Sequence, residues 1–190
     1  MQHRKYSLWL GAALCVWQLQ AAATVDEHSS LDTDAKSFSQ KKLEKMADKA
    51  AADYGLNPHL FRALITHESR WNARAVSSQN AIGLTQLQAP TAAEFCDLEP
   101  DELFDPAKNL DCGARYFAVQ LEDFGSVELA LCAYNLGPNR VKRAGKCPSD
   151  ISVTQKYIKT VTETWRDSLW GNVWVLDKWG YHLEDIFDFS

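Results

Sequence analysis

Helix start and stop signals constrain the fold of this chain more than any other feature. Asn57-Pro58 and Asp105-Pro106 each pair an N-cap residue with proline at the first helical position, and Gly125 and Gly145 are typical of helix ends. Between such signals, apolar residues recur at helical spacing. The sequence therefore predicts helices from Ser39 to Gly55, Asn57 to about Ser69, Asp105 to Gly125, Ser126 to about Asn135, Gly137 to Gly145, and about Ser152 to Leu169. No stretch before the C-terminal tail alternates as a strand would, so we predict a mainly α domain.

The N-terminus has the residue order of a secretory signal peptide. Arg4 and Lys5 precede an apolar run from Leu8 to Leu19, and three alanines follow at 21–23. The run is too short and too interrupted for a stable membrane span. We therefore expect a signal peptide at 1–23, a polar flexible tether at 24–38, and a mature protein that is periplasmic or secreted without a transmembrane span.

The charge of the chain limits its partners. The formal net charge of the 190 residues is −5, and removal of the two positive charges within 1–23 takes it to −7. An acidic domain with no basic stripe argues against nucleic acid and against anionic lipid as partners. We expect any polymer that it binds to be held by hydrogen bonds and stacking.

Four cysteines remain after the predicted signal peptide: Cys96, Cys112, Cys132 and Cys147. An even number in an exported chain predicts two disulfides, for which three pairings are open. We favour Cys96–Cys112 and Cys132–Cys147, because each links neighbouring segments. Buried free thiols are the alternative.

We expect neither a metal nor a cofactor. The cysteines show no C-x-x-C spacing. His67 does not begin a zinc motif, because Trp71 stands where H-E-x-x-H requires the second histidine. An ordinary structural role for His67 is the simpler interpretation.

Glu68 is the candidate catalytic residue. It shares a helical stripe with Phe61, Leu64 and Ile65, so its carboxyl points toward packed residues, and it lies in the last turn of the helix. Burial and the negative end of the helix dipole both raise the pKa of a carboxyl. A carboxylic acid that stays protonated near neutral pH can protonate a glycosidic oxygen. Taken alone, a partly exposed glutamate at a helix end would be the commoner explanation.

Two polar segments downstream suit sugar binding. Gly83 indicates a turn whose backbone approaches another segment, and Gln86 in the same turn offers an amide that both donates and accepts hydrogen bonds. Tyr134-Asn135 places a phenol and an amide at a helix end, within reach of a cleft. Taken alone, the segment around Gly83 and Gln86 is equally well explained as a turn before a helix, and Tyr134-Asn135 as a helix cap.

Together, in this order, the motifs resemble those of the soluble lytic transglycosylases, a family with a lysozyme-like fold that cleaves peptidoglycan. The resemblance covers about Leu56 to Val161. Its pieces are short and ordered: Glu68-Ser69, Trp71-Asn72, Ala75-Val76-Ser77, Gly83-Leu84, Gln86-Leu87, Pro90-Thr91-Ala92, Phe104-Asp105-Pro106, Asn109-Leu110, Gly113, Tyr116, Phe124-Gly125, Ala130-Leu131, Ala133-Tyr134-Asn135, Gly137-Pro138, Val141 and Tyr157-Ile158.

The resemblance implies cleavage of the β-1,4 bond between N-acetylmuramic acid and N-acetylglucosamine, with a 1,6-anhydro product and no water consumed. Glu68 would act as acid and then as base, and the N-acetyl oxygen of the substrate would replace a second carboxylate. For the remaining positions it implies substrate binding by Ser77 and Gln86, orientation of Glu68 by Tyr134, shaping of the cleft by Asn135, and a far cleft wall at Tyr157.

Three positions depart from the family pattern. Thr85 stands where the family usually has a methionine that packs against sugar, so we expect weaker apolar contact there. Leu136 replaces a usual alanine. The segment 153–155 is Val-Thr-Gln where Glu-Thr-Arg is common, which removes a polar residue from the expected wall.

We place the catalytic domain at 39–164 and an aromatic, acidic extension at 165–190. The extension holds Trp165, Trp170, Trp174 and Trp179. Aromatic residues of this kind fold back onto a domain, bind a protein partner or stack on sugars. Stand-alone domains of the family resemble enzymes that open the wall locally for secretion, conjugation or pilus machines, so a partner from such an apparatus is one expectation.

Two other functions stay open at this stage. A goose-type hydrolytic lysozyme would need a positioned water and a second carboxylate, for which Glu94, Asp97 and Asp101 are available. A non-catalytic wall-binding or assembly protein on the same fold would rely on the aromatic extension instead of Glu68.

Overall fold

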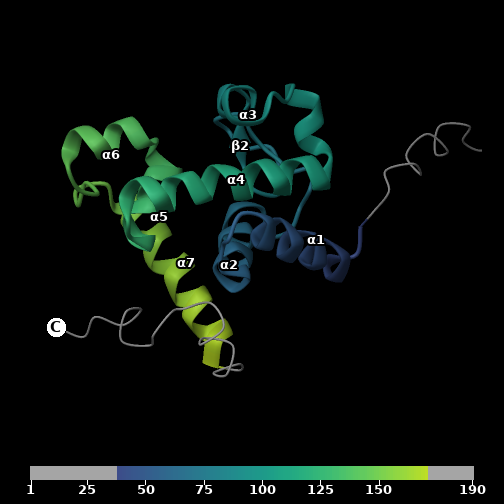
Figure 1. The fold of residues 1–190 in the computed structure, drawn as a ribbon. Coiled ribbons are helices and arrows are strands. Elements are labelled where there is room, and N and C mark those ends of the chain that lie inside the picture. Colours follow the sequence, from purple (N-terminus) through teal and green to yellow (C-terminus); the bar gives the residue numbers. More distant parts are fainter. Residues whose placement is uncertain (1–37, 171–190) are drawn as a thin grey trace, which may run out of the picture. The chain divides into compact units, whose positions relative to one another are not determined.

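The computed structural model describes residues 38–170, and this part of the chain is mainly helical, as predicted (Figure 1). Its elements are α1 Gln40–Asp53, α2 Pro58–Ser69, β1 Ala81–Ile82, β2 Leu87–Gln88, α3 Ala89–Cys96, the 3₁₀ helix η1 Pro100–Phe104, α4 Pro106–Phe124, α5 Val127–Leu136, α6 Pro138–Ala144 and α7 Ser152–Trp170. The expected signal peptide at 1–23, nearly all of the expected tether, and 171–190 lie outside the described residues. No helix within 38–170 is both long enough and apolar enough to cross a membrane.

The predicted helix caps form as the sequence indicated. Asn57 Oδ1 accepts hydrogen bonds from the backbone N–H groups of His59 and Leu60, at 2.9 and 3.1 Å. Asp105 caps α4 in the same way, and the Ser126 hydroxyl caps α5. Because these side chains satisfy N–H groups that have no partner inside the helix, they determine where α2, α4 and α5 begin.

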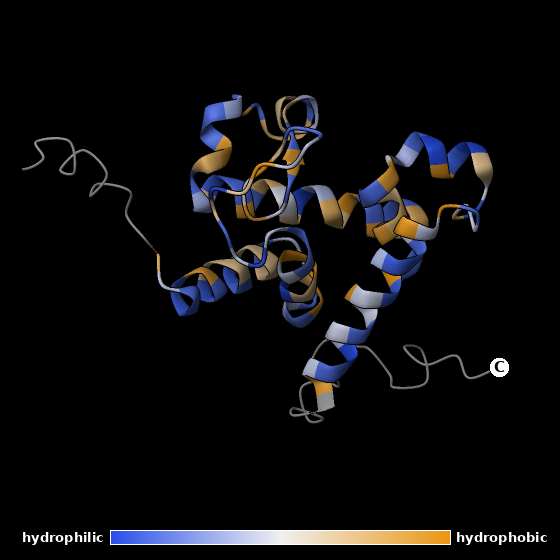
Figure 2. Ribbon diagram, turned by 180° about the vertical axis from the view of Figure 1, so that it is seen from behind, coloured by the Kyte–Doolittle hydropathy of each residue, from blue (hydrophilic) through white to orange (hydrophobic). Residues whose placement is uncertain are grey.

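The core is built around α2. Four of its side chains are fully buried, namely Leu60, Phe61, Leu64 and Ile65. α2 packs against α1 on one side and α7 on another, while α4 packs against α1 and α5. Figure 2 shows how apolar and hydrophilic residues alternate along these helices, which lets each present one face to its neighbours.

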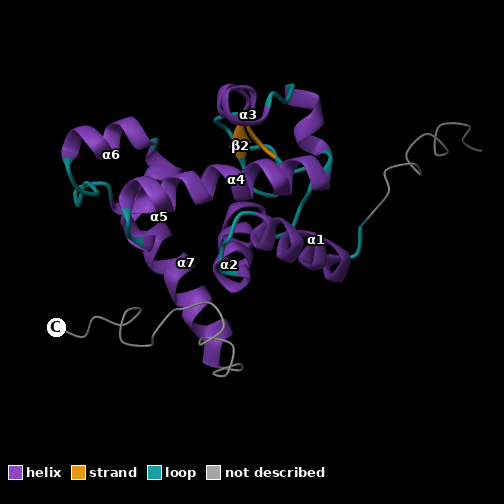
Figure 3. Cartoon of the chain, in the orientation of Figure 1, coloured by secondary structure: helices purple, strands orange, loops and turns teal. Residues whose placement is uncertain are grey.

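The structure adds a small hairpin that the sequence did not predict. β1 and β2 pair antiparallel, with Ala81 opposite Gln88 and Ile82 opposite Leu87 (Figure 3). The prediction of a mainly α domain is confirmed, and the hairpin is a small addition to it. Strands of two residues are too short to show an alternating pattern, so periodicity could not reveal them. The helices α3 and η1, between the hairpin and α4, were not predicted either.

Two disulfides hold the helices together in the pairing that the sequence favoured. Cys96–Cys112 joins α3 to α4, and Cys132–Cys147 joins α5 to the segment ahead of α7, with Cα–Cα distances of 5.8 and 5.9 Å. Each closes a loop of 15 or 16 residues. On the chain-entropy model, each contributes about 3 kcal/mol to stability.

The expected domain boundary after residue 164 falls inside a helix. α7 continues to Trp170, and within it Trp165 and Leu169 are 4% and 3% exposed and belong to the main core. The first residues of the presumed extension are therefore a packed part of the domain.

Candidate active site

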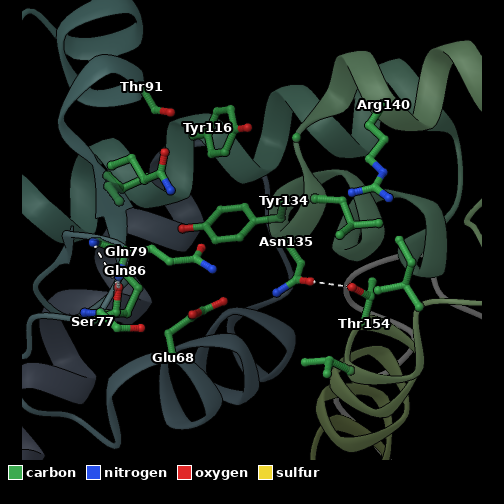
Figure 4. Close-up of a pocket in the computed structure, with 18 residues that line it drawn as sticks. Glu68, Ser77, Gln79, Gln86, Thr91, Tyr116, Tyr134, Asn135, Arg140 and Thr154 are labelled. Atoms are coloured by element: carbon green, nitrogen blue, oxygen red, sulfur yellow. Dashed lines mark hydrogen bonds between the residues drawn. The ribbon is translucent and has the colours of Figure 1, made fainter.

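A cleft of about 710 Å³ crosses the domain (Figure 4). Side chains from α2, from the hairpin and the loop before it, and from α3 to α7 line it. Four of the predicted site residues line this cleft together with Glu68: Ser77, Gln86, Tyr134 and Asn135. Tyr157 does not.

Glu68 lies in the last turn of α2 and points into the cleft (Figure 4). Its Oε1 accepts a hydrogen bond of 2.8 Å from the Tyr157 hydroxyl. Burial of the carboxyl raises its pKa from 4.5 to about 7, and the Tyr157 hydrogen bond opposes that rise in part. Near neutral pH the carboxyl is therefore close to half protonated, so it can both give and accept a proton.

Tyr157 lies behind Glu68 instead of on the cleft wall where the resemblance placed it. Its side chain is 3% exposed, on α7, which packs against α2. The His67 ring meets the Tyr157 ring edge-on, with 4.8 Å between centroids. Since α7 runs beside α2, a tyrosine 89 residues from Glu68 in sequence becomes its hydrogen-bond partner.

Tyr134 has a different contact from the one implied by the resemblance. Its hydroxyl donates to the backbone oxygen of Thr85 at 2.8 Å, not to Glu68. Its ring packs against Tyr116 and Phe117, with centroid distances of 5.2 and 5.8 Å. Tyr134 thus joins α5 to the hairpin turn and presents its ring to the cleft (Figure 4).

Thr85 does not face the cleft, so the expectation of a sugar contact at this position was wrong. The residue is fully buried, and its hydroxyl donates to Asn109 Oδ1 at 2.8 Å. Asn109 also accepts from the Thr85 N–H and donates to the backbone oxygens of Ile82 and Leu103, both at 3.0 Å. This one amide, also fully buried, joins the hairpin, η1 and α4.

Gly83 makes the close backbone approach that the sequence indicated. Its φ is +78°, and a Cβ atom there would collide with the Asn109 side chain and the Leu103 carbonyl. Glycine is therefore required both by the backbone conformation and by the space.

Gln86 and Ser77 line the cleft but also hold its hairpin wall. The Gln86 amide donates to the backbone oxygens of Gly83 and Ala75, at 3.0 and 3.2 Å, which leaves its Oε1 to accept from a ligand. The Ser77 hydroxyl accepts from the N–H groups of Gln79 and Ala81 and keeps its own hydrogen to donate. The pair therefore offers one acceptor and one donor.

Asn135 is held at the opposite wall by α7. Its Oδ1 accepts a 2.7 Å hydrogen bond from the Thr154 hydroxyl (Figure 4). Thr154 is buried, whereas its neighbour Val153 is 75% exposed and lines the cleft. The departure at 153–155 therefore replaces a polar surface with an apolar one, and Thr154 keeps a polar role by fixing Asn135.

The lining residues that the sequence did not reveal include Gln79, Arg140 and Ile151. Gln79 and Ile151 belong to loops, where no periodicity indicates the direction of a side chain. Arg140 lies in the first turn of α6, just after the Tyr134-Asn135 motif, and this proximity is the one signal that could have pointed to it.

Among the described residues, Glu68 is the only carboxylate that lines the cleft. Glu94, Asp97 and Asp101 are exposed and none of them is part of the lining. No cluster of three metal-binding side chains occurs within the part of the chain that the structure describes. The arrangement supplies one proton-transfer group, several neutral hydrogen-bonding groups and aromatic faces, which suits a glycan.

Comparison with known proteins agrees with this arrangement. Residues 45–157 match the family model described as the transglycosylase SLT domain. The chain is 35% identical over 100 residues to a transglycosylase of Enterobacteria phage PRD1, covering 53% of this chain and 37% of that protein. It is 40% identical over 82 residues to an endo-type membrane-bound lytic murein transglycosylase A of Salmonella paratyphi B, covering 39% of this chain and 40% of that protein. The matched regions thus span about two fifths of these relatives.

Solved structures share the fold. The 70 kDa soluble lytic transglycosylase of Escherichia coli superposes with a TM-score of 0.62 at 23% identity, covering 74% of this chain and 26% of that one. An inactive mutant of the lytic transglycosylase Slt of Pseudomonas aeruginosa gives 0.61 at 23% identity, covering 76% and 25%. The expectation of a lysozyme-like fold is confirmed.

Proposed function

Because this chain belongs to the transglycosylase SLT family, we propose that it is a peptidoglycan lytic transglycosylase. The observation that carries the proposal is Glu68: a single carboxyl in a cleft suited to sugars, with its pKa raised to about 7. An acid with this pKa is suited to protonate a glycosidic oxygen and then to act as a base.

The proposed reaction cleaves the β-1,4 bond between N-acetylmuramic acid and N-acetylglucosamine. Glu68 gives its proton to the glycosidic oxygen, and the C1–O bond breaks as the N-acetyl oxygen of the muramic acid attacks C1. The Glu68 carboxylate then takes the proton of the C6 hydroxyl, whose oxygen attacks C1 and displaces the N-acetyl oxygen. The proton lost in the first step is regained, and the product has a 1,6-anhydro end with no water consumed.

The surrounding residues take supporting roles in this proposal. Tyr157 positions Glu68 and stabilises its carboxylate between the two steps, since it is a hydrogen-bond donor at 2.8 Å. Ser77, Gln86 and Asn135 would hold sugar hydroxyl and N-acetyl groups, and Tyr134 would offer its ring to a sugar face.

The proposal favours this reaction over hydrolysis because a hydrolase of the two-carboxylate kind needs a second acid beside the cleft. The described cleft lining holds Glu68 alone. A purely structural role is disfavoured by the burial of Glu68, because placing a carboxyl where its ionisation is penalised has no benefit for folding.

Mass spectrometry of digested peptidoglycan tests the proposal. Wild-type protein should release 1,6-anhydro ends, Glu68→Gln should release none, and Glu122→Gln, at an exposed site on α4, should behave as wild type. Reducing ends from the wild type would identify a hydrolase instead. No soluble product from any variant would favour the wall-binding or assembly function.

Export to the periplasm is part of the same proposal. It is supported by the signal-like order of residues 1–23 and by two disulfides, which persist in oxidising compartments. We further propose that the enzyme opens the wall locally for a secretion, conjugation or pilus machine. The extension predicted at 165–190 would dock to that machine through its residues beyond Leu169, since Trp165 and Leu169 themselves are buried in the core.

A further inference from the structure

The two ends of the cleft differ in chemistry (Figure 4). On the hairpin side of Glu68 the lining is neutral and mostly polar: besides Ala81 and Leu87 it holds Ser77, Ser78, Gln79, Gln86, Gln88 and Thr91. On the α6 and α7 side it is mostly apolar with one cation: the buried Thr154 apart, its side chains are Leu136, Arg140, Ile151 and Val153. The first end suits sugar hydroxyls. The second end offers little to a bare sugar, since it lacks amides apart from Asn135 at its inner edge.

Arg140 is the cation of this second end. It is the only lysine or arginine in the described cleft lining, and its side chain extends from α6 toward the cleft (Figure 4). The residue is exposed, and it takes part in none of the ion pairs among residues 38–169. A guanidinium with no carboxylate partner among these residues, in a chain of net charge −5, is available to a ligand anion.

The neighbouring side chains indicate what carries that anion. Val153 is 75% exposed, and Leu136 and Ile151 are half-buried, so three aliphatic groups line the same cleft as the guanidinium. A bare sugar presents hydroxyls to such a surface, whereas a short peptide presents alkyl side chains together with a carboxylate. Exposed aliphatic residues beside a free cation therefore match a peptide better than a glycan.

We propose that this end of the cleft, defined by Leu136, Arg140, Ile151 and Val153, binds the peptide substituent of the muramic acid, with Arg140 donating hydrogen bonds to a peptide carboxylate. The inference rests on the proposed function, because it assumes a peptidoglycan strand in the cleft. It makes Arg140 a specificity-determining residue: strands with free peptide carboxylates are preferred over otherwise identical strands in which those carboxylates are amides.

The test measures binding by calorimetry in a Glu68→Gln background, so that no ligand is consumed. The probes are tetrasaccharides of alternating N-acetylglucosamine and N-acetylmuramic acid that carry dipeptides with either free or amidated carboxyls. We expect the free acid to bind about two- to fivefold more tightly, with a preference that shrinks as salt rises. Arg140→Gln should abolish the preference. Arg143→Gln, exposed on the same short helix but outside the cleft lining, should keep it.

Equal affinity for the two probes before mutation, or a preference that survives Arg140→Gln, would overturn the proposal. A third probe without peptides carries free lactyl carboxylates on its muramic acids. If Arg140→Gln weakens the binding of that probe alone, Arg140 recognises the lactyl carboxylate, and the assignment to the peptide is wrong. Val153→Ser should weaken both peptide-bearing probes equally, which separates apolar contact from charge. Product analysis of the wild type tests the proposed function independently, since none of these binding measurements requires cleavage.

Discussion

Replacing Glu68 by glutamine should stabilise the protein at alkaline pH and hardly affect it in acid. The pKa of Glu68 is raised by burial from 4.5 to about 7. Between these values the folded protein binds a proton that the unfolded chain does not, so the free energy of unfolding falls as pH rises through this window. The 2.5 pH units between the two pKa values correspond to a loss of about 3 kcal/mol, at roughly 1.4 kcal/mol per unit. Glutamine is neutral like the protonated acid and can still accept a hydrogen bond from Tyr157. The free energy of unfolding of the variant therefore does not fall over this pH range.

Urea unfolding followed by tryptophan fluorescence measures the effect. At pH 8.5 Glu68→Gln should exceed the wild type by about 3 kcal/mol, or roughly 6–12 °C in a thermal melt. At pH 4.5 the two should agree within about 0.5 kcal/mol. Glu122→Gln is the matched control, because Glu122 is exposed on α4. A difference between Glu68→Gln and wild type that stays constant from pH 4.5 to 8.5 would refute the account, since it would show that the folded state does not hold this proton.

Two further predictions concern the neighbours of Glu68 and the hairpin. Tyr157→Phe removes the hydrogen bond that lowers the pKa of Glu68, so the alkaline limb of the pH–rate profile should move upward by about one pH unit. Tyr54→Phe, away from the cleft, is the control. An unmoved limb in Tyr157→Phe, or an equal movement in Tyr54→Phe, would contradict this prediction. Asn109→Ala removes four hydrogen bonds made by a fully buried side chain. It should lower the free energy of unfolding, measured in urea, by about 3 kcal/mol. A loss below about 1 kcal/mol would show that the hairpin does not depend on this amide.

Local signals explain why the helices were predictable. An N-cap such as Asn57 or Asp105 acts on N–H groups two or three residues away, so its effect is readable from neighbouring letters. The burial of Glu68 was predictable for the same reason, because Phe61, Leu64 and Ile65 share its side of α2 and are all buried.

Contacts between distant segments explain what was not predictable. Whether Tyr134 or Tyr157 reaches Glu68 depends on where α5 and α7 lie relative to α2, and no pattern within either helix specifies that. Thr85 and Asn109 are separated by 24 residues. The sequence around Thr85 therefore does not indicate that its side chain points inward toward Asn109. The cleft position of Arg140 likewise follows from where α6 is placed.

The position of α7 links the far end of the domain to the chemistry of the cleft. Tyr157 can lower the pKa of Glu68 only while its hydroxyl stays within hydrogen-bond distance, and that distance is set by the packing of α7 on α2. Two to three turns beyond Tyr157, the same helix buries Trp165 and Leu169 in the core. Loosening those residues would let α7 move away from α2, which would weaken the Tyr157 hydrogen bond and let water reach Glu68. Because burial is the larger cause of the shift, the pKa of Glu68 would then fall toward its ordinary value. Residues outside the cleft lining therefore help to keep the pKa of Glu68 near the pH at which it can both give and take a proton.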